Sequence, residues 1–538
     1  MRFLIFIAIF ILTHVSLESE NYESGGILSL EQGSIDVGHY TLDIKIDPYK
    51  KVISGSVDIE FQLLKKTNKI VIDLINDYSL SGAIINGMSL AYIHKENKIF
   101  IDNPGLELFK KNLLSIKYGG RPPVAENPPW DGGFTWSKSK DGKDWVGVSC
   151  QTNGANIWFP CKEHPSDKSN GADIFITVPP SLMAVSNGLL QSQKTLKDRW
   201  VRWHWKTEYP ISTYNINITV GAFEVIEKTG YILDKPLKMV YYVLPEKKDG
   251  GKGLLDEAEE YLNFYAESFG QYPWINEKFG LVHTPYLGME HQTINAYGNK
   301  YKKTKRGYDF ILFHEAGHEW WGNYLSVADW SDFWIHEGFD TYAECMYIEQ
   351  KFGLESAKNF IDERYKKNIV NKGPVVPDRN STAKHNSGND VYYKGAHILH
   401  MLRYLIGRDV LWETLKEYIA MPKELPDNQT STKEFISLIN ENTERDLGWF
   451  FNQYLYLKDL PTLCRFEKTV KDKRFVDLWW EEDGFKMPIE VHYFSFDGRR
   501  EKKLNLNNER QRIVVPANSK LIIDPERWLL FKEKTKRQ

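Results

Sequence analysis

The amino-acid sequence predicts a multidomain α+β protein in which a mainly helical domain lies between two β domains. Three observations predict this order. Apolar and polar residues alternate with the period of a strand from about residue 35 to residue 228. Apolar residues then recur at helical spacing to about residue 456, and the strand pattern returns after that point. A chain of 538 residues is also too long for one ordinary domain and suggests two to four.

Residues 1–19 have the pattern of a secretory signal peptide. One Arg precedes a short apolar block that ends at Thr13, and this block is too short to span a bilayer comfortably. Cleavage is expected near Ser16 or Ser19, and an uncleaved membrane anchor is the alternative. We therefore expect an exported protein (periplasmic, cell-surface or secreted) with no stable membrane span after signal removal.

Residues 20–228 are predicted to form a large antiparallel β domain. Positions 40–46, 57–63 and 214–220 each alternate between apolar and polar side chains. Within this domain, residues 128–136 (Pro-Pro-Trp-Asp-Gly-Gly-Phe-Thr-Trp) are expected to form a loop with two tryptophans. The loop either lies at the rim of a substrate groove or packs against the sheet, and packing against the sheet is the favoured interpretation.

Residues 229–456 are predicted to be mainly helical. Apolar residues between Leu254 and Tyr265 have helical spacing, and Ser431 with Glu434 forms a capping box before a later helix. An apolar alternation at residues 278–283 predicts a strand region, extending to about residue 297, beside these helices.

Residues 457–538 are predicted to form a small β domain. Positions 475–480, 489–494 and 512–515 have strand patterns, and Asp497-Gly498 is a hairpin turn signal.

The most informative stretch of the chain is His-Glu-Ala-Gly-His at residues 314–318, followed after eighteen residues by Glu337. On a helix, His314 and His318 lie one turn apart on the same face, so both imidazoles can reach one ion. Glu337 can return as an acidic third ligand. Two His and one Glu leave the fourth position of a zinc ion open for water, which is typical of a catalytic site, and Glu315 is placed to take a proton from that water.

Two further segments have residues that suit such a site. Glu290, in the Gly-Met-Glu-His stretch at residues 288–291, follows a predicted strand and could hold a positive charge of the substrate; a solvated surface Glu is the alternative. Tyr392 opens an apolar helix, and its hydroxyl could donate a hydrogen bond to a developing oxyanion; a tyrosine packed in the core is the alternative.

Together these segments resemble the zinc aminopeptidases of the aminopeptidase N and leukotriene hydrolase family. The matching motifs are Gly-Met-Glu at 288–290, His-Glu-x-x-His-x-Trp-x-Gly-Asn at 314–323, Trp-x-x-Glu-Gly-Phe at 334–339 and Tyr-x-Lys-Gly-Ala at 392–396. Their order and spacing agree over more than a hundred residues. The resemblance implies a saddle-like N-terminal β domain, a thermolysin-like catalytic domain, one Zn²⁺ per chain, and peptide substrates with a free N-terminus.

The resemblance also implies a role for each matching residue. His314, His318 and Glu337 would bind zinc, Glu315 would act as general base, and Tyr392 rather than Tyr393 would stabilise the oxyanion. The substrate-binding residues implied are Glu290 for the α-amino group, Gln151 assisting it, and Gly288, Met289 and His291 lining the site.

There is one clear departure from the family motifs. His291 occupies a position where the family usually has Asn, which changes the expected pocket shape; titration of His291 near neutral pH is a further hypothesis. Longer members carry an additional helical domain over the active site, and this sequence ends before one, so a more open site or a lid from a dimer partner is expected.

Composition narrows the remaining choices. The formal net charge of −3 gives no argument for nucleic-acid binding. Among the four cysteines, Cys150 and Cys161 either pair or remain free, and the sequence leaves both options open, as it does the oligomeric state. The basic run at residues 300–306 either steers acidic peptides or is a solvated loop, and the second is favoured.

Two other functions compete with an aminopeptidase. One is a zinc endopeptidase in which Glu290 is structural. The other is a non-catalytic binding protein, against which the joint presence of all three ligands, the base and the tyrosine argues.

Overall fold

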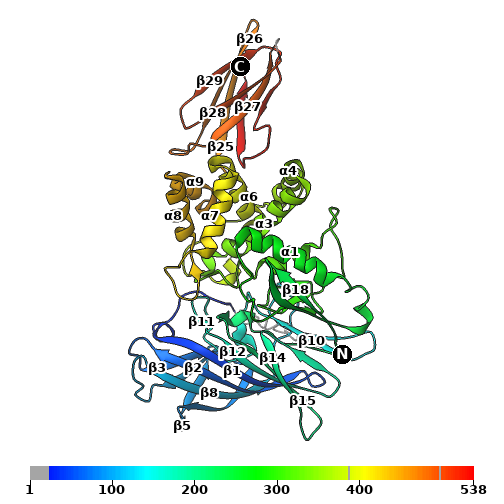
Figure 1. Cartoon of the computed structure of the whole chain (residues 1–538). Coiled ribbons are helices and arrows are strands. Elements are labelled where there is room, and N and C mark those ends of the chain that lie inside the picture. Colours follow the sequence, from blue (N-terminus) through cyan, green and yellow to red (C-terminus); the bar gives the residue numbers. More distant parts are fainter. Residues whose placement is uncertain (1–22, 386–387, 496–497, 538) are drawn as a thin grey trace, which may run out of the picture.

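The computed structural model describes residues 23–385, 388–495 and 498–537. The predicted signal peptide and Asp497 of the predicted turn lie outside the described residues. Figure 1 shows the N-terminal β domain at one end of an elongated molecule, the helical domain in the middle and the C-terminal β domain at the other end. This is the predicted α+β order of β-rich, helical and β-rich parts.

An eight-stranded sheet forms the body of the N-terminal domain. Its strands are, in spatial order, β14 (Leu189–Thr195), β15 (Val201–Thr207), β12 (Ala172–Val178), β1 (Ile35–Asp47), β2 (Val52–Leu63), β8 (Lys111–Gly120), β4 (Tyr78–Ile85) and β5 (Met88–Ser89). The period-two pattern has its expected cause, because Leu42, Ile44 and Ile46 are fully buried while the residues between them are not. Most pairings are antiparallel as predicted, but β1 and β12 pair in parallel.

Smaller sheets complete this domain. They are β13 (Met183–Val185), β17 (Thr219–Gly221), β10 (Asp144–Ser149) and β9 (Gly133–Lys138); β3 (Lys69–Asp73), β7 (Lys98–Asp102) and β6 (Tyr92–Lys95); and β11 (Lys168–Ser169) with β16 (Ile211–Ser212).

The strand predicted at residues 214–220 is wrong for most of its length. Thr213–Asn215 is a 3₁₀ turn, and β17 begins only at Thr219. The apolar residues are buried as expected, but side-chain amides replace a strand partner: Asn217 Nδ2 donates to the carbonyl of Val148 (2.8 Å) and Asn187 Oδ1 accepts from the Asn217 N–H (2.8 Å).

The helical domain contains a five-stranded sheet of its own. Its spatial order is β18 (Glu224–Ile232), β19 (Lys235–Val243), β20 (Phe279–His283), β22 (Asn295–Tyr297) and β21 (Gly288–Met289). The predicted domain boundary between residues 228 and 229 falls inside β18, so it is placed too late in the chain. The reason is that β18 belongs by its hydrogen bonds to the sheet of the second domain, which the alternation pattern alone could not reveal.

Helices cover this sheet and form most of the domain. They are α1 (Leu254–Phe269), α2 (Phe310–Gly317), α3 (Trp334–Phe352), α4 (Leu354–Phe360), α5 (Lys366–Asn368), α6 (Asn389–Ile406), α7 (Arg408–Ala420), α8 (Thr432–Thr443) and α9 (Gly448–Phe451). A short strand pair, β23 (Ser326–Val327) and β24 (Gln429–Thr430), lies among them. The predicted cap is present at α8, where Ser431 Oγ accepts from the Glu434 N–H (3.3 Å).

The C-terminal domain consists of two sheets. One is β29 (Gln511–Pro516), β26 (Lys473–Trp480), β25 (Thr462–Val470) and β31 (Lys532–Arg537), and the other is β28 (Gly498–Asn505), β27 (Pro488–Ser495) and β30 (Leu521–Ile523). The three predicted strands are therefore present.

Buried lysines join the N-terminal and helical domains. Lys168 Nζ donates to the carbonyls of Asn323 (2.7 Å) and Tyr324 (3.3 Å), and Lys278 Nζ donates to that of Ser186 (3.2 Å).

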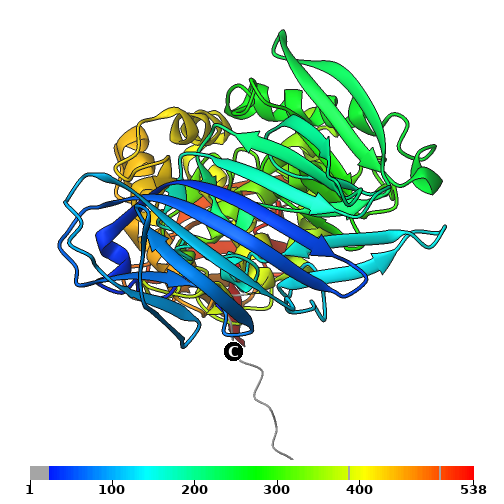
Figure 2. The ribbon, with the colours of Figure 1, turned by 90° about the horizontal axis from the view of Figure 1, so that it is seen from below.

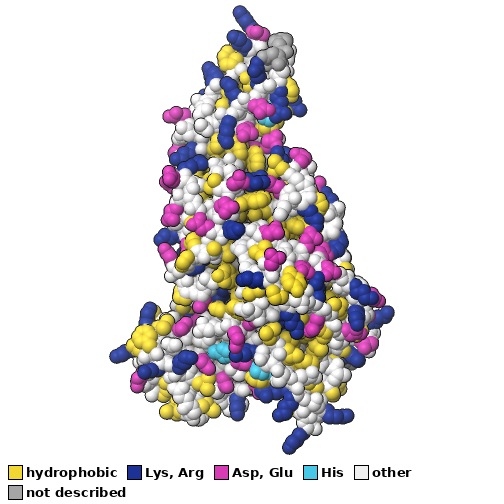
Figure 3. Space-filling view, in the orientation of Figure 1, with side chains coloured by type: hydrophobic (Ala, Val, Ile, Leu, Met, Phe, Trp, Pro, Cys, Tyr) yellow, Lys and Arg dark blue, Asp and Glu magenta, His cyan; other side chains and the backbone are white. Residues whose placement is uncertain are grey.

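Figure 2 shows the sheet of the N-terminal domain in front of the helical domain when the molecule is seen from below. Side chains of both charge signs are interspersed over the face in Figure 3. Over the described residues, the helices are all too short or too polar to traverse a lipid bilayer.

Candidate active site

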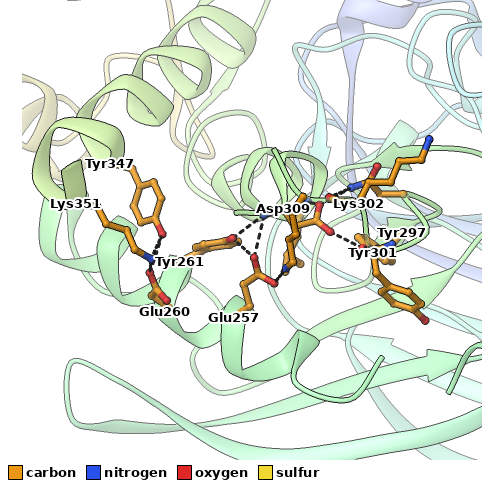
Figure 4. Close-up of polar contacts among 12 residues, drawn as sticks. Glu257, Glu260, Tyr261, Tyr297, Tyr301, Lys302, Asp309, Tyr347 and Lys351 are labelled. Atoms are coloured by element: carbon orange, nitrogen blue, oxygen red, sulfur yellow. Dashed lines mark hydrogen bonds and ion pairs between the residues drawn. The ribbon is translucent and has the colours of Figure 1, made fainter. Parts of the chain in front are cut away.

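The helix that begins the His-Glu-x-x-His segment is fixed at its N-terminus by a hydrogen-bond network. Asp309 caps α2, since its Oδ1 accepts from the Leu312 N–H (3.2 Å). Its own N–H donates to Glu257 Oε1 and to the Tyr261 hydroxyl, both on α1 at 3.0 Å, and the Tyr297 hydroxyl donates to its Oδ2 (2.5 Å). Figure 4 shows Asp309 between the α1 residues and Tyr297. The start of α2 is thereby tied to both α1 and the sheet.

Three predicted metal ligands converge at the other end of α2. His314 lies in its last turn, His318 directly follows it, and Glu337 lies in the first turn of α3. The two Nε2 atoms are 3.2 Å apart, and Glu337 Oε2 lies 3.5 Å from that of His314 and 3.4 Å from that of His318.

These separations suit a tetrahedral zinc ion. Ligand atoms about 2.0–2.1 Å from a tetrahedral centre lie about 3.3 Å from one another. Glu337 Oε2 is moreover buried without a hydrogen-bond donor among the described residues, which suits an oxygen that coordinates a metal. The residues present therefore fit the predicted zinc ion.

The outer nitrogens of the two imidazoles have different partners. His314 Nδ1 lies 2.6 Å from Asp340 Oδ2, and His318 Nδ1 lies 2.8 Å from the carbonyl of Trp321. Both partners leave Nε2 free to face the metal site. Burial alone would lower the pKa of His318, but the Glu337 carboxylate raises it to about 10.

Glu315 lies beside the three predicted ligands, and Gly288 packs closely against its carboxylate. A Cβ atom on Gly288 would lie 2.4 Å from Glu315 Oε1, so a larger residue there would displace the carboxylate. Burial raises the pKa of Glu315 to about 8. A carboxyl group whose pKa is raised in this way can both accept and donate a proton near neutral pH.

Glu290 follows the edge strand β21 and is held from both domains. Its Oε1 accepts from Gln151 Nε2 (2.5 Å) and from the Tyr214 hydroxyl (3.2 Å), both in the N-terminal domain. Glu290, Glu315 and His318 offer side-chain atoms within 4.8 Å of one another. A carboxylate thus lies directly next to the metal site.

A buried carboxylate fixes the Glu290 segment to the metal-binding segment. Glu319 accepts hydrogen bonds from Trp274 Nε1 (2.8 Å), the Thr293 N–H (3.0 Å) and Asn323 Nδ2 (3.0 Å). Asn323 Nδ2 also donates to the carbonyl of Glu290 (2.9 Å). The spacing between His318 and Glu290 is therefore set by this network.

The pocket over these residues has a volume of about 370 Å³. Gln151, Gly288, Met289 and Tyr392 line it, together with Glu290, Glu315 and the three ligands. Burial and the nearby Glu337 raise the pKa of Tyr392 well above its ordinary value, so its hydroxyl is a proton donor. Tyr393 lines the pocket as well.

The loop predicted at residues 128–136 reaches the pocket. Pro129 and the half-exposed Trp130 are among the lining residues, which favours a loop at the rim of a groove over one that only packs against the sheet.

His291 is the one predicted site residue that the structure does not bring to the pocket. It is fully buried, and its Nε2 lies 3.1 Å from Asn217 Nδ2. Burial lowers its pKa to about 3, which contradicts the hypothesis of titration near neutral pH. The chain turns after Glu290, with the His291 N–H bonded to the carbonyl of Met289 (3.0 Å), and this turn directs the side chain inward.

The structure also decides two alternatives that the sequence leaves open. All four cysteines are free and buried, so Cys150 and Cys161 do not pair. In the basic run, Lys303 pairs with Glu257 and Lys305 with Glu363, away from the pocket lining.

Three site residues escaped the sequence analysis. Tyr214 carried only an apolar-alternation signal, and Arg364, which also lines the pocket, carried none. Asp340, which lies beside His314, had a signal that was not used: it is three residues after Glu337 and shares its helix face.

Comparisons with known proteins agree with this architecture. Residues 254–454 match the family profile described as Peptidase family M1 domain, and residues 37–215 match the one described as Peptidase M1 N-terminal domain. Endoplasmic reticulum aminopeptidase 1 of Homo sapiens is 26% identical over 302 residues, covering 52% of this chain and 32% of that protein. Puromycin-sensitive aminopeptidase of Caenorhabditis elegans is 22% identical over 550 residues, covering 93% of this chain and 54% of that protein.

A crystal structure of an M1 zinc metallopeptidase from Deinococcus radiodurans is similar in fold, with a TM-score of 0.67 and 22% identity, covering 80% of this chain and 95% of that chain. The chain spans between about a third and about half of the length of the curated relatives it matches.

Proposed function

Because this chain belongs to peptidase family M1, we propose that it is a zinc-dependent aminopeptidase that hydrolyses the N-terminal peptide bond of peptides. The observation that carries the proposal is the closeness of Glu290 to the metal site, with side-chain atoms of Glu290, Glu315 and His318 within 4.8 Å of one another. In a peptide, the amino nitrogen and the carbonyl carbon of one residue are only about 2.5 Å apart. An α-ammonium group held by Glu290 therefore leaves room for one residue before the scissile bond.

His314, His318 and Glu337 would hold the zinc ion. Bound there, zinc would supply Lewis-acid chemistry: it would polarise the substrate carbonyl and lower the pKa of a bound water towards neutrality. The remaining steps belong to side chains of this protein.

Glu315 takes the proton of the attacking water and returns it to the leaving nitrogen. Its burial raises its pKa, which suits a group that must both accept and donate a proton. Tyr392 donates a hydrogen bond to the oxyanion that develops on the carbonyl oxygen.

Glu290 accepts the α-ammonium group as its counter-charge. Gln151 and Tyr214 orient this carboxylate by donating to its Oε1. The Glu290 side chain is largely desolvated, since the residue is 3% exposed, and an ion pair is strong in such surroundings. An N-acetylated peptide would leave the carboxylate without its partner, which disfavours binding.

The proposal is tested with one peptide series, free or N-acetylated, incubated with the full chain in the presence or absence of a zinc chelator. We expect release of single residues from the free peptides only, stopped by the chelator and restored by added zinc. Cleavage of the acetylated peptides at internal bonds would replace the proposal with an endopeptidase. Cleavage that persists after complete zinc removal would overturn the metal site.

We also propose that the protein is exported. The support is the basic residue and apolar block within residues 1–19. Expression with and without these residues, followed by N-terminal sequencing of the exported product, tests this; equal retention of both forms inside the cell contradicts it.

A further inference from the structure

One cationic side chain in the pocket has no role in the reaction described above. Arg364 lines the pocket with His314 and Tyr393, and among the described lining residues it is the only Lys or Arg. It comes from the π-helical turn Ile361–Tyr365 that follows α4. Such turns interrupt the regular helix and often place a side chain at a functional site.

Among the residues that the structure describes, the terminal amino groups of Arg364 donate no hydrogen bond. Its Nε lies 3.6 Å from Glu344 Oε2, beyond hydrogen-bond distance, and that is its closest approach to an acid in the described chain. Glu344 is itself engaged through its other oxygen with the Tyr308 hydroxyl. The guanidinium carbon lies 3.9 Å from the ring centroid of Phe310.

A charged group in this position favours an anionic partner. The Arg364 side chain is 27% exposed, so most of it has lost contact with water. Stacking on Phe310 holds the guanidinium plane, and the open amino groups are the ones that bind carboxylates in a bidentate manner.

Arg364 and Glu290 neighbour different metal ligands. Glu290 groups with His318 and Glu315. Arg364 instead stacks on Phe310, whose ring stacks on His314 with centroids 5.5 Å apart. Because the proposed function assigns the substrate's amino end to Glu290, the part of the pocket near His314 and Arg364 is left for the residues that follow the scissile bond.

We propose that Arg364 binds a carboxylate of the substrate on the leaving side of the scissile bond, an inference that rests on the proposed aminopeptidase function. The two stacking contacts put the guanidinium within about 10 Å of the His314 ring, which corresponds to two or three residues of extended chain. The carboxylate is therefore the C-terminus of a di- or tripeptide, or an acidic side chain at the second or third residue.

Two substrate pairs separate these sources. The first is Leu-Gly-Gly with a free C-terminus against Leu-Gly-Gly amide, and the second is Leu-Glu-Gly amide against Leu-Gln-Gly amide. For the wild type we expect kcat/KM to be at least tenfold higher for the charged member of one pair or both. A wild-type ratio near one in both pairs overturns the proposal, and this measurement depends on no variant.

The variant Arg364→Gln assigns the preference to this side chain. We expect it to bring the ratio close to one, mainly through a higher KM for the charged substrate, while Arg364→Lys keeps part of it. Arg306→Gln is the matched control, because Arg306 also stacks on a phenylalanine and meets an acid, Glu363, but does not line the pocket. An unchanged ratio in Arg364→Gln overturns the assignment.

Leucine p-nitroanilide, which carries no carboxylate, separates failure of this inference from failure of the proposed function. If the wild type hydrolyses it without discriminating within the peptide pairs, the carboxylate site alone is wrong. If the wild type hydrolyses neither the anilide nor any peptide, the aminopeptidase proposal itself fails.

Discussion

Asp340 Oδ2 lies 2.6 Å from Nδ1 of His314, so a buried carboxylate holds one of the three converging ligands from behind. The second Asp340 oxygen accepts from the Tyr265 hydroxyl (2.7 Å), which fixes the carboxylate in turn. A carboxylate behind a metal-binding imidazole orients the ring and makes it a better ligand. His318 has only a backbone carbonyl in the equivalent place, so the two imidazoles are not equivalent.

Asp340→Asn is expected to weaken zinc binding about 10- to 100-fold, because the variant loses the charge behind His314. Competition with a chromophoric chelator measures the Kd directly, without recourse to activity. Asp362→Asn, which removes an acid paired with Arg527, is the control and should leave the Kd unchanged. Equal zinc affinity in Asp340→Asn and wild type would show that the contact serves only folding.

Glu315→Gln is expected to keep one zinc ion per chain and to lose activity by about 10²- to 10⁴-fold, the usual contribution of a general acid–base group. Glutamine has nearly the same shape but cannot take up the proton. Zinc content by elemental analysis and kcat are measured on the same sample. Activity near the wild-type level with full zinc content excludes Glu315 as the base.

Tyr392→Phe is expected to lower kcat about 10²- to 10³-fold with little change in KM, since the lost hydrogen bond forms mainly in the transition state. Tyr393→Phe is the matched control, because the neighbouring tyrosine also lines the pocket. The opposite result, with Tyr393→Phe the slower enzyme, would exchange the two assignments. A rise in KM alone would make Tyr392 a binding residue.

Glu290→Gln is expected to raise KM for peptides with a free N-terminus at least tenfold, because a desolvated ion pair is lost. The same variant should narrow the difference between free and N-acetylated peptides. Steady-state kinetics on both peptide forms check this. An unchanged preference for free peptides would place the amine anchor elsewhere in the pocket.

The sequence predicted the parts of the site that lie on single elements. His314, Glu315 and His318 follow from the pitch of one helix, and the order of β-rich and helical parts follows from periodicity. The strand region that leads to Glu290 is local in the same way.

The remaining features depend on contacts between distant segments. Tyr214 reaches Glu290 across 76 residues of sequence, and a buried tyrosine gives no hint of its partner. Arg364 owes its place to a π-helical turn, which no periodicity announces. His291 shows the converse error, because adjacency to Glu290 in the chain does not bring a side chain to the same cavity when the backbone turns between them.

The proposed anchor for the amino group is assembled across a domain junction, whereas the three metal ligands all lie in the helical domain. Glu290 belongs to the helical domain, and its two donors Gln151 and Tyr214 belong to the N-terminal domain, which Lys168 joins to the segment after His318. In the proposed enzyme, specificity for cleavage after the first residue therefore depends on how the two domains pack against each other. Substitutions that weaken the contacts between the two domains should make the position of the cleaved bond less specific while zinc remains bound. Cleavage specificity and zinc affinity can therefore change independently during evolution.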